Sequence, residues 1–170
     1  MNKPMSKEGR QRLEDWKYGP RPYHHNQPIL IAHLGNIDGR DDQRENSLAY
    51  LQAALKQGYH VCCHVIFQYG VFLLPSARGL EQISGGLLAN SRVWCRAESA
   101  ETLDALCAIS AHAFSAAAPY SLTSAGFIWT LPESPLAPRA IAVLPELASP
   151  RWFELSDAAG VCSDEIARYL

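Results

Sequence analysis

The feature that most constrains the fold is a short apolar run, Ile29–His33, which is followed by Leu34, Gly35 and Asn36. A continuous apolar run of this length is typical of a strand that is buried on both faces, as in parallel sheets. Beyond it, leucines recur at helical spacing over residues 45–57, and Gly58 is a suitable C-terminal stop. A strand, a polar turn and a helix predict the first unit of an alternating α/β fold.

The same alternation continues to the C-terminus. Further strands are expected over residues 60–67, 93–97, 112–115, 127–130, 141–144 and 161–162, with 70–74 returning from the second strand as a hairpin. Helices are expected over 100–109 and 164–169, the last of them capped by Ser163. About seven strands with few full crossover helices predict a shortened parallel β/α barrel of the TIM type, in a single domain.

The N-terminal 27 residues differ from the rest in composition. They carry six Lys and Arg against three acidic residues, together with Trp16, Tyr18 and Tyr23. We therefore expect a partly basic arm over 1–27 and a domain over 28–170. The arm either docks onto a partner protein or lies along the domain as a tail.

Composition narrows the environment. The formal net charge of −2 predicts no general attraction to nucleic acid. No apolar run approaches the ~20 residues of a membrane span, and the N-terminus lacks the apolar core of a secretory signal. The five cysteines are odd in number and show no C-x-x-C spacing, which favours reduced thiols and a cytoplasmic location.

The opening segment resembles the start of the glycerophosphodiester phosphodiesterase (PLC-like phosphodiesterase) superfamily. His33, Gly35, Glu45 and Asn46 match its first motif, and weaker matches follow in order over 93–95, 122–129, 143–146 and 160–164. The resemblance implies a β/α barrel with His33 as a catalytic residue and Glu45 as a metal ligand at the barrel mouth.

The other catalytic positions of that family are replaced in this chain. The family's Arg is replaced by Leu34, and its pair of acidic residues on the second strand is replaced by Cys62 and His64. Its second His and the acid that follows correspond to residues 74–77, which contain neither. Its His-x-Lys is replaced by Arg96 and Glu98. Phosphodiester hydrolysis requires a metal and a positioned acid and base. The sequence therefore predicts a degenerate, non-catalytic member that acts as a binding or structural subunit, through residues 1–27 or the barrel mouth.

A rebuilt metal centre is the first alternative. Glu45, Cys62 and His64 would be its ligands, with His60 on the same strand face and Cys95 as a possible addition. Thiolate and imidazole would move the preference from magnesium towards zinc or iron. The competing interpretation is that these side chains fill the barrel interior and that no cofactor is bound.

A phosphate-binding or small-molecule-binding module is the second alternative. Arg96 and Asn36 would hold the anion, with His33 beside them. The competing interpretation pairs Arg96 with Glu98, gives His33 a buried hydrogen bond, and makes Glu45 a helix cap. An enzyme or ligand binder requires these residues to converge on an open cavity, whereas a scaffold requires a filled mouth.

Overall fold

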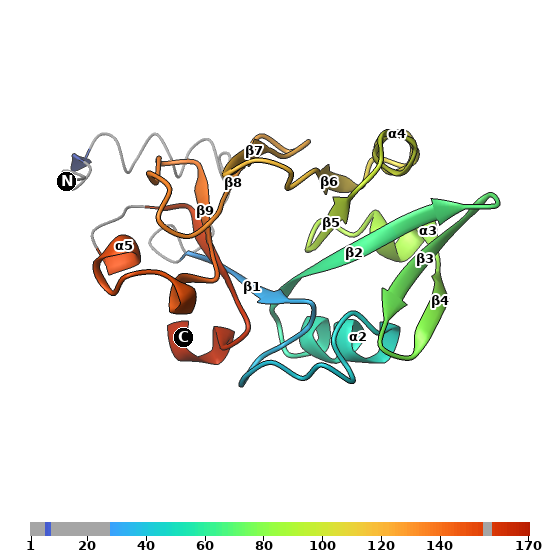
Figure 1. Cartoon of the computed structure of the whole chain (residues 1–170), viewed down its shortest axis with the longest axis horizontal. Coiled ribbons are helices and arrows are strands. Elements are labelled where there is room, and N and C mark those ends of the chain that lie inside the picture. The colour runs from blue at the N-terminus through green and yellow to red at the C-terminus, as the bar shows by residue number, and fades with distance from the viewer. Residues whose placement is uncertain (1–5, 8–27, 155–157) are drawn as a thin grey trace.

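In a computed structural model of the chain, residues 6–7, 28–154 and 158–170 can be described, and they form one mixed sheet with four short α-helices (Figure 1). The strands are β1 (Ile29–His33), β2 (His60–Gln68), β3 (Val71–Ser76), β4 (Gly79–Ile83), β5 (Val93–Ala97), β6 (His112–Phe114), β7 (Tyr120–Leu122), β8 (Ile128–Thr130), β9 (Ala140–Val143) and β10 (Gly160–Ser163). The α-helices are α2 (Leu48–Lys56), α3 (Gly85–Leu88), α4 (Ala100–Ala108) and α5 (Arg151–Glu154), and Pro145–Leu147 and Ile166–Tyr169 are 3-10 turns.

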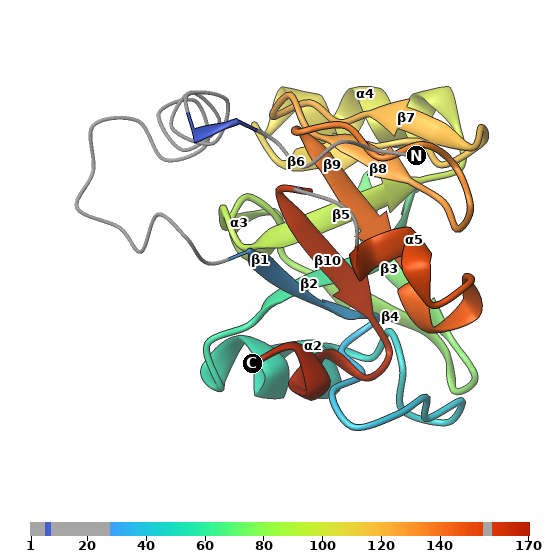
Figure 2. The same cartoon turned by 90° about the vertical axis from the view of Figure 1, so that its left-hand side faces the viewer.

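Seven strands run parallel in the order β6-β5-β2-β1-β10-β9-β8 (Figure 2). The long strand β2 continues beyond this parallel region and pairs there with β3, which in turn pairs with β4, both antiparallel. At the other end of the sheet, β7 adds to β8 in the antiparallel sense. The chain therefore combines seven parallel strands with two antiparallel additions, one along the extension of β2 and one beside β8.

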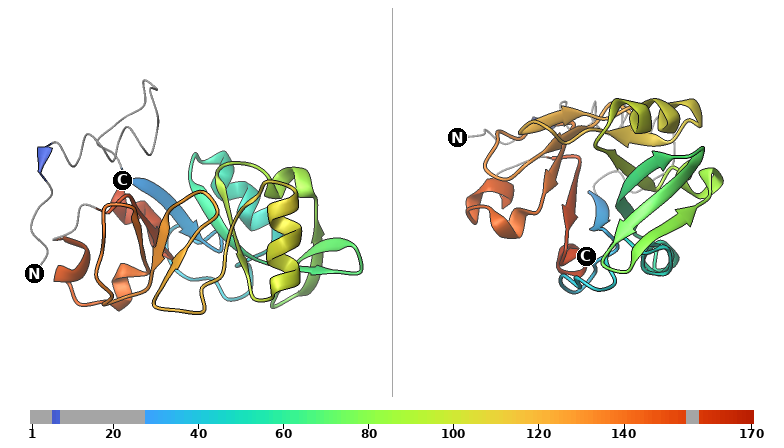
Figure 3. Two further views of the ribbon diagram at one scale, coloured as in Figure 1. Left: turned by 90° about the horizontal axis from the view of Figure 1, so that it is seen from above. Right: turned by 45° about the vertical axis from the view of Figure 1, so that its right-hand side comes forward.

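The predicted TIM-type β/α barrel is wrong. The sheet is mixed, and of the helices in the described residues only α2 and α4 reach nine residues, so most crossovers lack the covering helix that such a barrel requires. The sheet curves until β6 approaches the β7–β8 hairpin (Figure 3). In the described chain these ends do not pair as strands: the Ser124 amide donates to the Ala113 carbonyl at 2.8 Å, and the Ala113 amide donates to Ser124 Oγ at 2.8 Å.

The two faces of the sheet carry separate apolar clusters. On β2, Val61, Cys63 and Val65 pack beneath α2, α3 and α4. Cys62 points to the opposite face, into a cluster with Trp94 and aromatic side chains of later strands. This alternation is the period-2 pattern of a strand buried on both sides.

The first helix begins later than predicted. Ser47 is its N-cap, and its Oγ accepts a hydrogen bond from the Tyr50 amide at 3.3 Å, so α2 starts at Leu48 rather than at residue 45. Glu45 therefore lies before the helix and does not cap it. The predicted terminal helix is a 3-10 turn, in front of which Ser163 Oγ accepts from the Glu165 amide at 2.9 Å.

The predicted N-terminal arm lies outside the described residues, apart from Ser6 and Lys7. In the described part of the chain, no helix has the length and apolar content that a membrane span requires.

Candidate ligand-binding pocket

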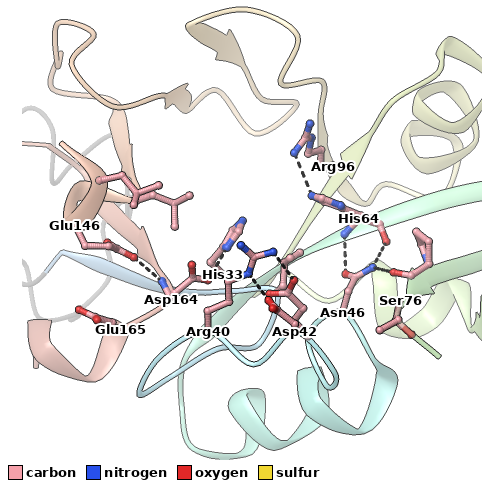
Figure 4. Close-up of a pocket in the computed structure, with 16 residues that line it drawn as sticks. His33, Arg40, Asp42, Asn46, His64, Ser76, Arg96, Glu146, Asp164 and Glu165 are labelled. Atoms are coloured by element: carbon pink, nitrogen blue, oxygen red, sulfur yellow. Dashed lines mark hydrogen bonds and ion pairs between the residues drawn. The ribbon is translucent and has the colours of Figure 1, made fainter. Parts of the chain in front are cut away.

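A pocket of about 590 Å³ opens where the parallel strands β1, β5 and β10 end (Figure 4). This edge is where ligands bind in parallel sheets, and the volume suits a small molecule. The charged and imidazole side chains that line it are His33, Arg40, Asp42, Glu45, His64, Arg96, Glu146, Asp164 and Glu165. The predicted residues His33, Glu45, His64 and Arg96 thus converge on an open cavity.

A hydrogen-bonded group around His33 forms one part of the pocket. His33 Nδ1 lies 2.8 Å from Asp164 Oδ1, which joins the end of β1 to the residue after β10. Asn36 Nδ2 donates to Asp164 Oδ1 at 2.8 Å and to Glu45 Oε2 at 3.1 Å. Arg40 Nη2 lies 3.4 Å from Glu45 Oε1. Asn36 is fully buried, so it positions carboxylates rather than contacting a ligand.

These neighbours make His33 a cation at neutral pH. Burial alone would lower its pKa, but the negative charges of Cys62, Asp164 and Glu45 and the hydrogen bond to Asp164 outweigh burial and raise the pKa to about 8. The same contact lowers the pKa of Asp164, against the opposing effect of burial. Since Nδ1 donates to Asp164, the imidazolium retains the Nε2 proton as a second donor.

Asn46 fixes the neighbouring part of the pocket. Its side chain is 3 % exposed and makes the two hydrogen bonds to the β2 backbone that a longer β1 would otherwise make. Oδ1 accepts from the His64 amide at 2.9 Å, and Nδ2 donates to the His64 carbonyl at 3.0 Å. Nδ2 also donates to the Pro75 carbonyl at 2.8 Å. One amide group thereby joins β2 and β3 to the segment that follows β1.

Arg96 and His64 form the wall opposite Asp164. Burial, followed by the charges of Arg96 and His33, lowers the pKa of His64 to about 4, so its ring is neutral. His64 Nε2 therefore accepts from Arg96 Nη1 at 3.1 Å. The predicted ion pair is confirmed, with Arg96 Nη2 3.5 Å from an oxygen of Glu98. Arg96 Nε is buried and has no hydrogen-bond partner within the described residues.

Backbone strain gathers at this pocket. In the described chain six non-glycine residues have positive φ, and three of them, Leu34, Asn46 and Leu144, line the pocket. Leucine is poorly suited to this left-handed region, and each such residue costs about 1–3 kcal/mol. Strain of this kind persists where the surrounding structure holds a functional geometry in place.

The predicted metal ligands do not form a metal site. Cys62 is 2 % exposed and lies 3.6 Å, sulfur to sulfur, from Cys162 in the apolar cluster. His64 uses Nε2 to accept from Arg96, and Cys95 belongs to the cluster on the other sheet face. Within residues 6–7, 28–154 and 158–170, no three His, Cys, Asp or Glu side chains are placed to hold an ion. The donor set therefore does not fit the divalent metal that the resemblance implies.

The sequence interpretation missed two carboxylates. Asp164 directly follows the buried strand β10, and Glu146 lies three residues after the end of the buried strand β9; acidic residues so close after such strands are the available signal. Glu146 accepts from Ser163 Oγ and from the Asp164 amide, both at 3.0 Å. From the sequence, Glu146 is part of a motif match, and Asp164 is part of another and begins the last predicted helix; neither is predicted to line a binding site.

Comparison with known protein families, with curated proteins and with solved structures gave no match in any of the three cases. The functional argument therefore rests on the pocket itself.

The charge of His33 gives a testable pH dependence. Replacing Asp164 by asparagine is expected to lower the pKa of His33 from about 8, because the variant loses the negative charge of Asp164 and the charge-assisted hydrogen bond that oppose the effect of burial. Proton NMR titration of the imidazole signals measures this. His112, whose pKa burial lowers to about 4 and whose Nε2 contacts Thr123, is the internal control and should not change. An unchanged His33 titration would contradict the assigned role of Asp164.

The same shift predicts how stability varies with pH. A histidine whose pKa is raised on folding stabilises the protein fully below its unfolded value near 6.5, and this contribution is lost as the pH rises through about 8. The contribution amounts to about 2 kcal/mol. The difference in unfolding free energy between the wild type and the Asp164→Asn variant should therefore shrink between pH 6 and pH 9 in urea denaturation.

Proposed function

We propose that this protein binds a small phosphate-bearing ligand in the pocket and does not hydrolyse it. The observation that carries the proposal is the convergence of two cationic side chains, His33 and Arg96, from different strands on one open cavity. The His33 imidazolium has a second donor in Nε2, and the Arg96 side chain, which is 34 % exposed, lines the pocket with its guanidinium group.

The donor types suit a phosphate group. Hydrogen bonds from charged donors to an anionic oxygen contribute about 1.5–3 kcal/mol each, and guanidinium groups match phosphate oxygens well. A tetrahedral phosphate accepts bonds from several directions. His33 and Arg96 come from different sides of the pocket, and Ser76 adds a hydroxyl from β3. A planar carboxylate would use fewer of these directions.

The same residues argue against phosphodiester hydrolysis by the mechanism that the resemblance implies. That reaction needs a second proton carrier opposite His33. His64 is neutral and shares its available lone pair with Arg96, and the segment beyond it supplies only Pro75, Ser76 and Ala77 to the pocket. Since the carboxylates do not form a metal site, we infer a binding pocket with a degenerate catalytic apparatus.

The open cavity favours ligand binding over a purely structural role. A scaffold would be expected to fill this mouth with apolar side chains, yet eleven of the sixteen residues that line the pocket are charged or polar. Contact with a protein partner through residues 1–27 stays a prediction. Four of the five free cysteines are buried, which supports our placement of the protein in a reducing compartment such as the cytoplasm.

Calorimetry and a hydrolysis assay test this proposal together. Titration with glycerol 3-phosphate should show binding, with a dissociation constant on the order of 0.1–1 mM. Bis(p-nitrophenyl) phosphate should stay intact in the presence of magnesium, calcium, manganese or zinc. Absence of binding would overturn the proposal, and so would turnover that disappears in a His33→Ala variant.

A further inference from the structure

The charges around the pocket are not all balanced by partners. His33 pairs with Asp164, Arg40 lies 2.7 Å from Asp42 and 3.4 Å from Glu45, and Glu165 pairs with Arg168. These contacts neutralise most of the lining. Glu146 is the exception among the pocket carboxylates, because no basic side chain of the described residues forms an ion pair with it.

Glu146 is nevertheless held in a fixed position. Its two oxygens accept from Ser163 Oγ and from the Asp164 amide, both neutral donors. Leu144, with φ of 50°, sets the direction in which the chain leaves β9 before Glu146. A carboxylate can accept about four hydrogen bonds, so Glu146 keeps both its charge and free acceptor capacity.

Glu146 and Arg96 lie on opposite sides of the pocket (Figure 4). Within the described residues Arg96 has one acidic partner, Glu98, at 3.5 Å, and the side chain of Glu98 is 74 % exposed, so solvent weakens that pair. The pocket therefore carries residual positive charge at one side and residual negative charge at the other. A simple anion gains at Arg96 but meets repulsion from Glu146.

The surroundings of Glu146 include apolar surface. Leu144 lines the pocket, and Leu147, which also lines it, is 71 % exposed although it is a large apolar side chain. A carboxylate beside exposed leucines suits an ammonium group on a short alkyl chain, because the charge meets Glu146 while the methylene groups cover the leucines.

We propose that the preferred ligand is an aminoalkyl phosphate, a zwitterion whose phosphate contacts His33 and Arg96 and whose ammonium contacts Glu146. This rests on the proposed function and specifies the ligand of the same pocket. The ammonium group is attracted to Glu146, and it also offsets the repulsion that a phosphate without an amine would meet from this carboxylate.

Calorimetric titration with phosphoethanolamine and with ethyl phosphate tests the inference, since the two differ by the amine. The wild type should bind phosphoethanolamine about tenfold more tightly than ethyl phosphate, a difference in binding free energy of about 1.4 kcal/mol. Glu146→Gln should abolish that preference and keep the affinity for ethyl phosphate equal to or above that of the wild type. Glu165→Gln is the matched control: it removes a pocket carboxylate that already pairs with Arg168, so the preference should persist.

Each outcome separates the two proposals. Equal binding of both compounds by the wild type, or a preference that survives in Glu146→Gln, overturns the assignment of the ligand and leaves phosphate binding intact. Absence of binding by either compound overturns the proposed function itself. If Glu146→Gln does not fold by circular dichroism, salt provides the second measurement: the wild-type preference should shrink between 0.05 M and 0.5 M NaCl, and a constant preference would contradict a charge contact.

Discussion

Replacing Asn46 by leucine is expected to lower the free energy of unfolding by about 3–5 kcal/mol, because each buried polar group left without a partner costs about 1–3 kcal/mol. The substitution leaves the amide and carbonyl of His64 and the carbonyl of Pro75 without the side-chain bonds that satisfy them. Leucine also tolerates the φ of 61° at this position less well than asparagine does. Urea denaturation followed by circular dichroism measures the change.

The matched control is Asn90→Leu. Asn90 is exposed, and its side chain accepts one bond from the Arg92 amide at 2.9 Å. Water replaces that bond, so the cost should stay below about 1 kcal/mol. Similar losses for the two variants would contradict the role of Asn46 as a buried connection between β1, β2 and β3.

Replacing Arg96 by glutamine is expected to weaken phosphate binding about 10- to 100-fold, which corresponds to the loss of one or two charge-assisted hydrogen bonds. Stability should change little, because Glu98, the acidic partner of Arg96, is 74 % exposed, and solvent-screened pairs of this kind contribute about 0–1 kcal/mol. Calorimetry with glycerol 3-phosphate measures the affinity.

Arg78→Gln removes the same charge from an exposed position that does not line the pocket. It should leave the affinity within about twofold of the wild type. An equal loss in both variants would mean that the net charge of the protein, and not the pocket, governs binding.

Strand positions were largely predictable from the sequence, and the way they assemble was not. The apolar runs at Ile29–His33 and Val93–Ala97 are strands as predicted, because a run of this kind has to be buried on both faces. An apolar run does not show whether the segment that follows it forms a helix or an antiparallel strand. The short crossovers and the antiparallel pairs β3–β4 and β7–β8 therefore made the barrel prediction wrong.

The site was predicted best where its residues are close in sequence. Asn36 and Glu45 are nine residues apart and are bonded to each other, whereas Asp164 reaches His33 across 131 residues and gave no local signal. Strand alternation correctly put Cys62 and His64 on one face. Alternation does not show how far along the strand a side chain lies from the pocket. Cys62 comes two residues before His64, about 6.6 Å earlier along β2, and it contacts Cys162 rather than the pocket.

The most direct test of ligand binding is an NMR titration of isotope-labelled protein with inorganic phosphate, followed at the arginine Nε–H and histidine ring signals. Binding in the pocket predicts saturable shifts of Arg96 Nε–H and of the His33 ring, while Arg78 and His112 stay unchanged. Shifts confined to other side chains, or no saturable shift up to tens of millimolar phosphate, would contradict the central claim that this pocket is a phosphate-binding site.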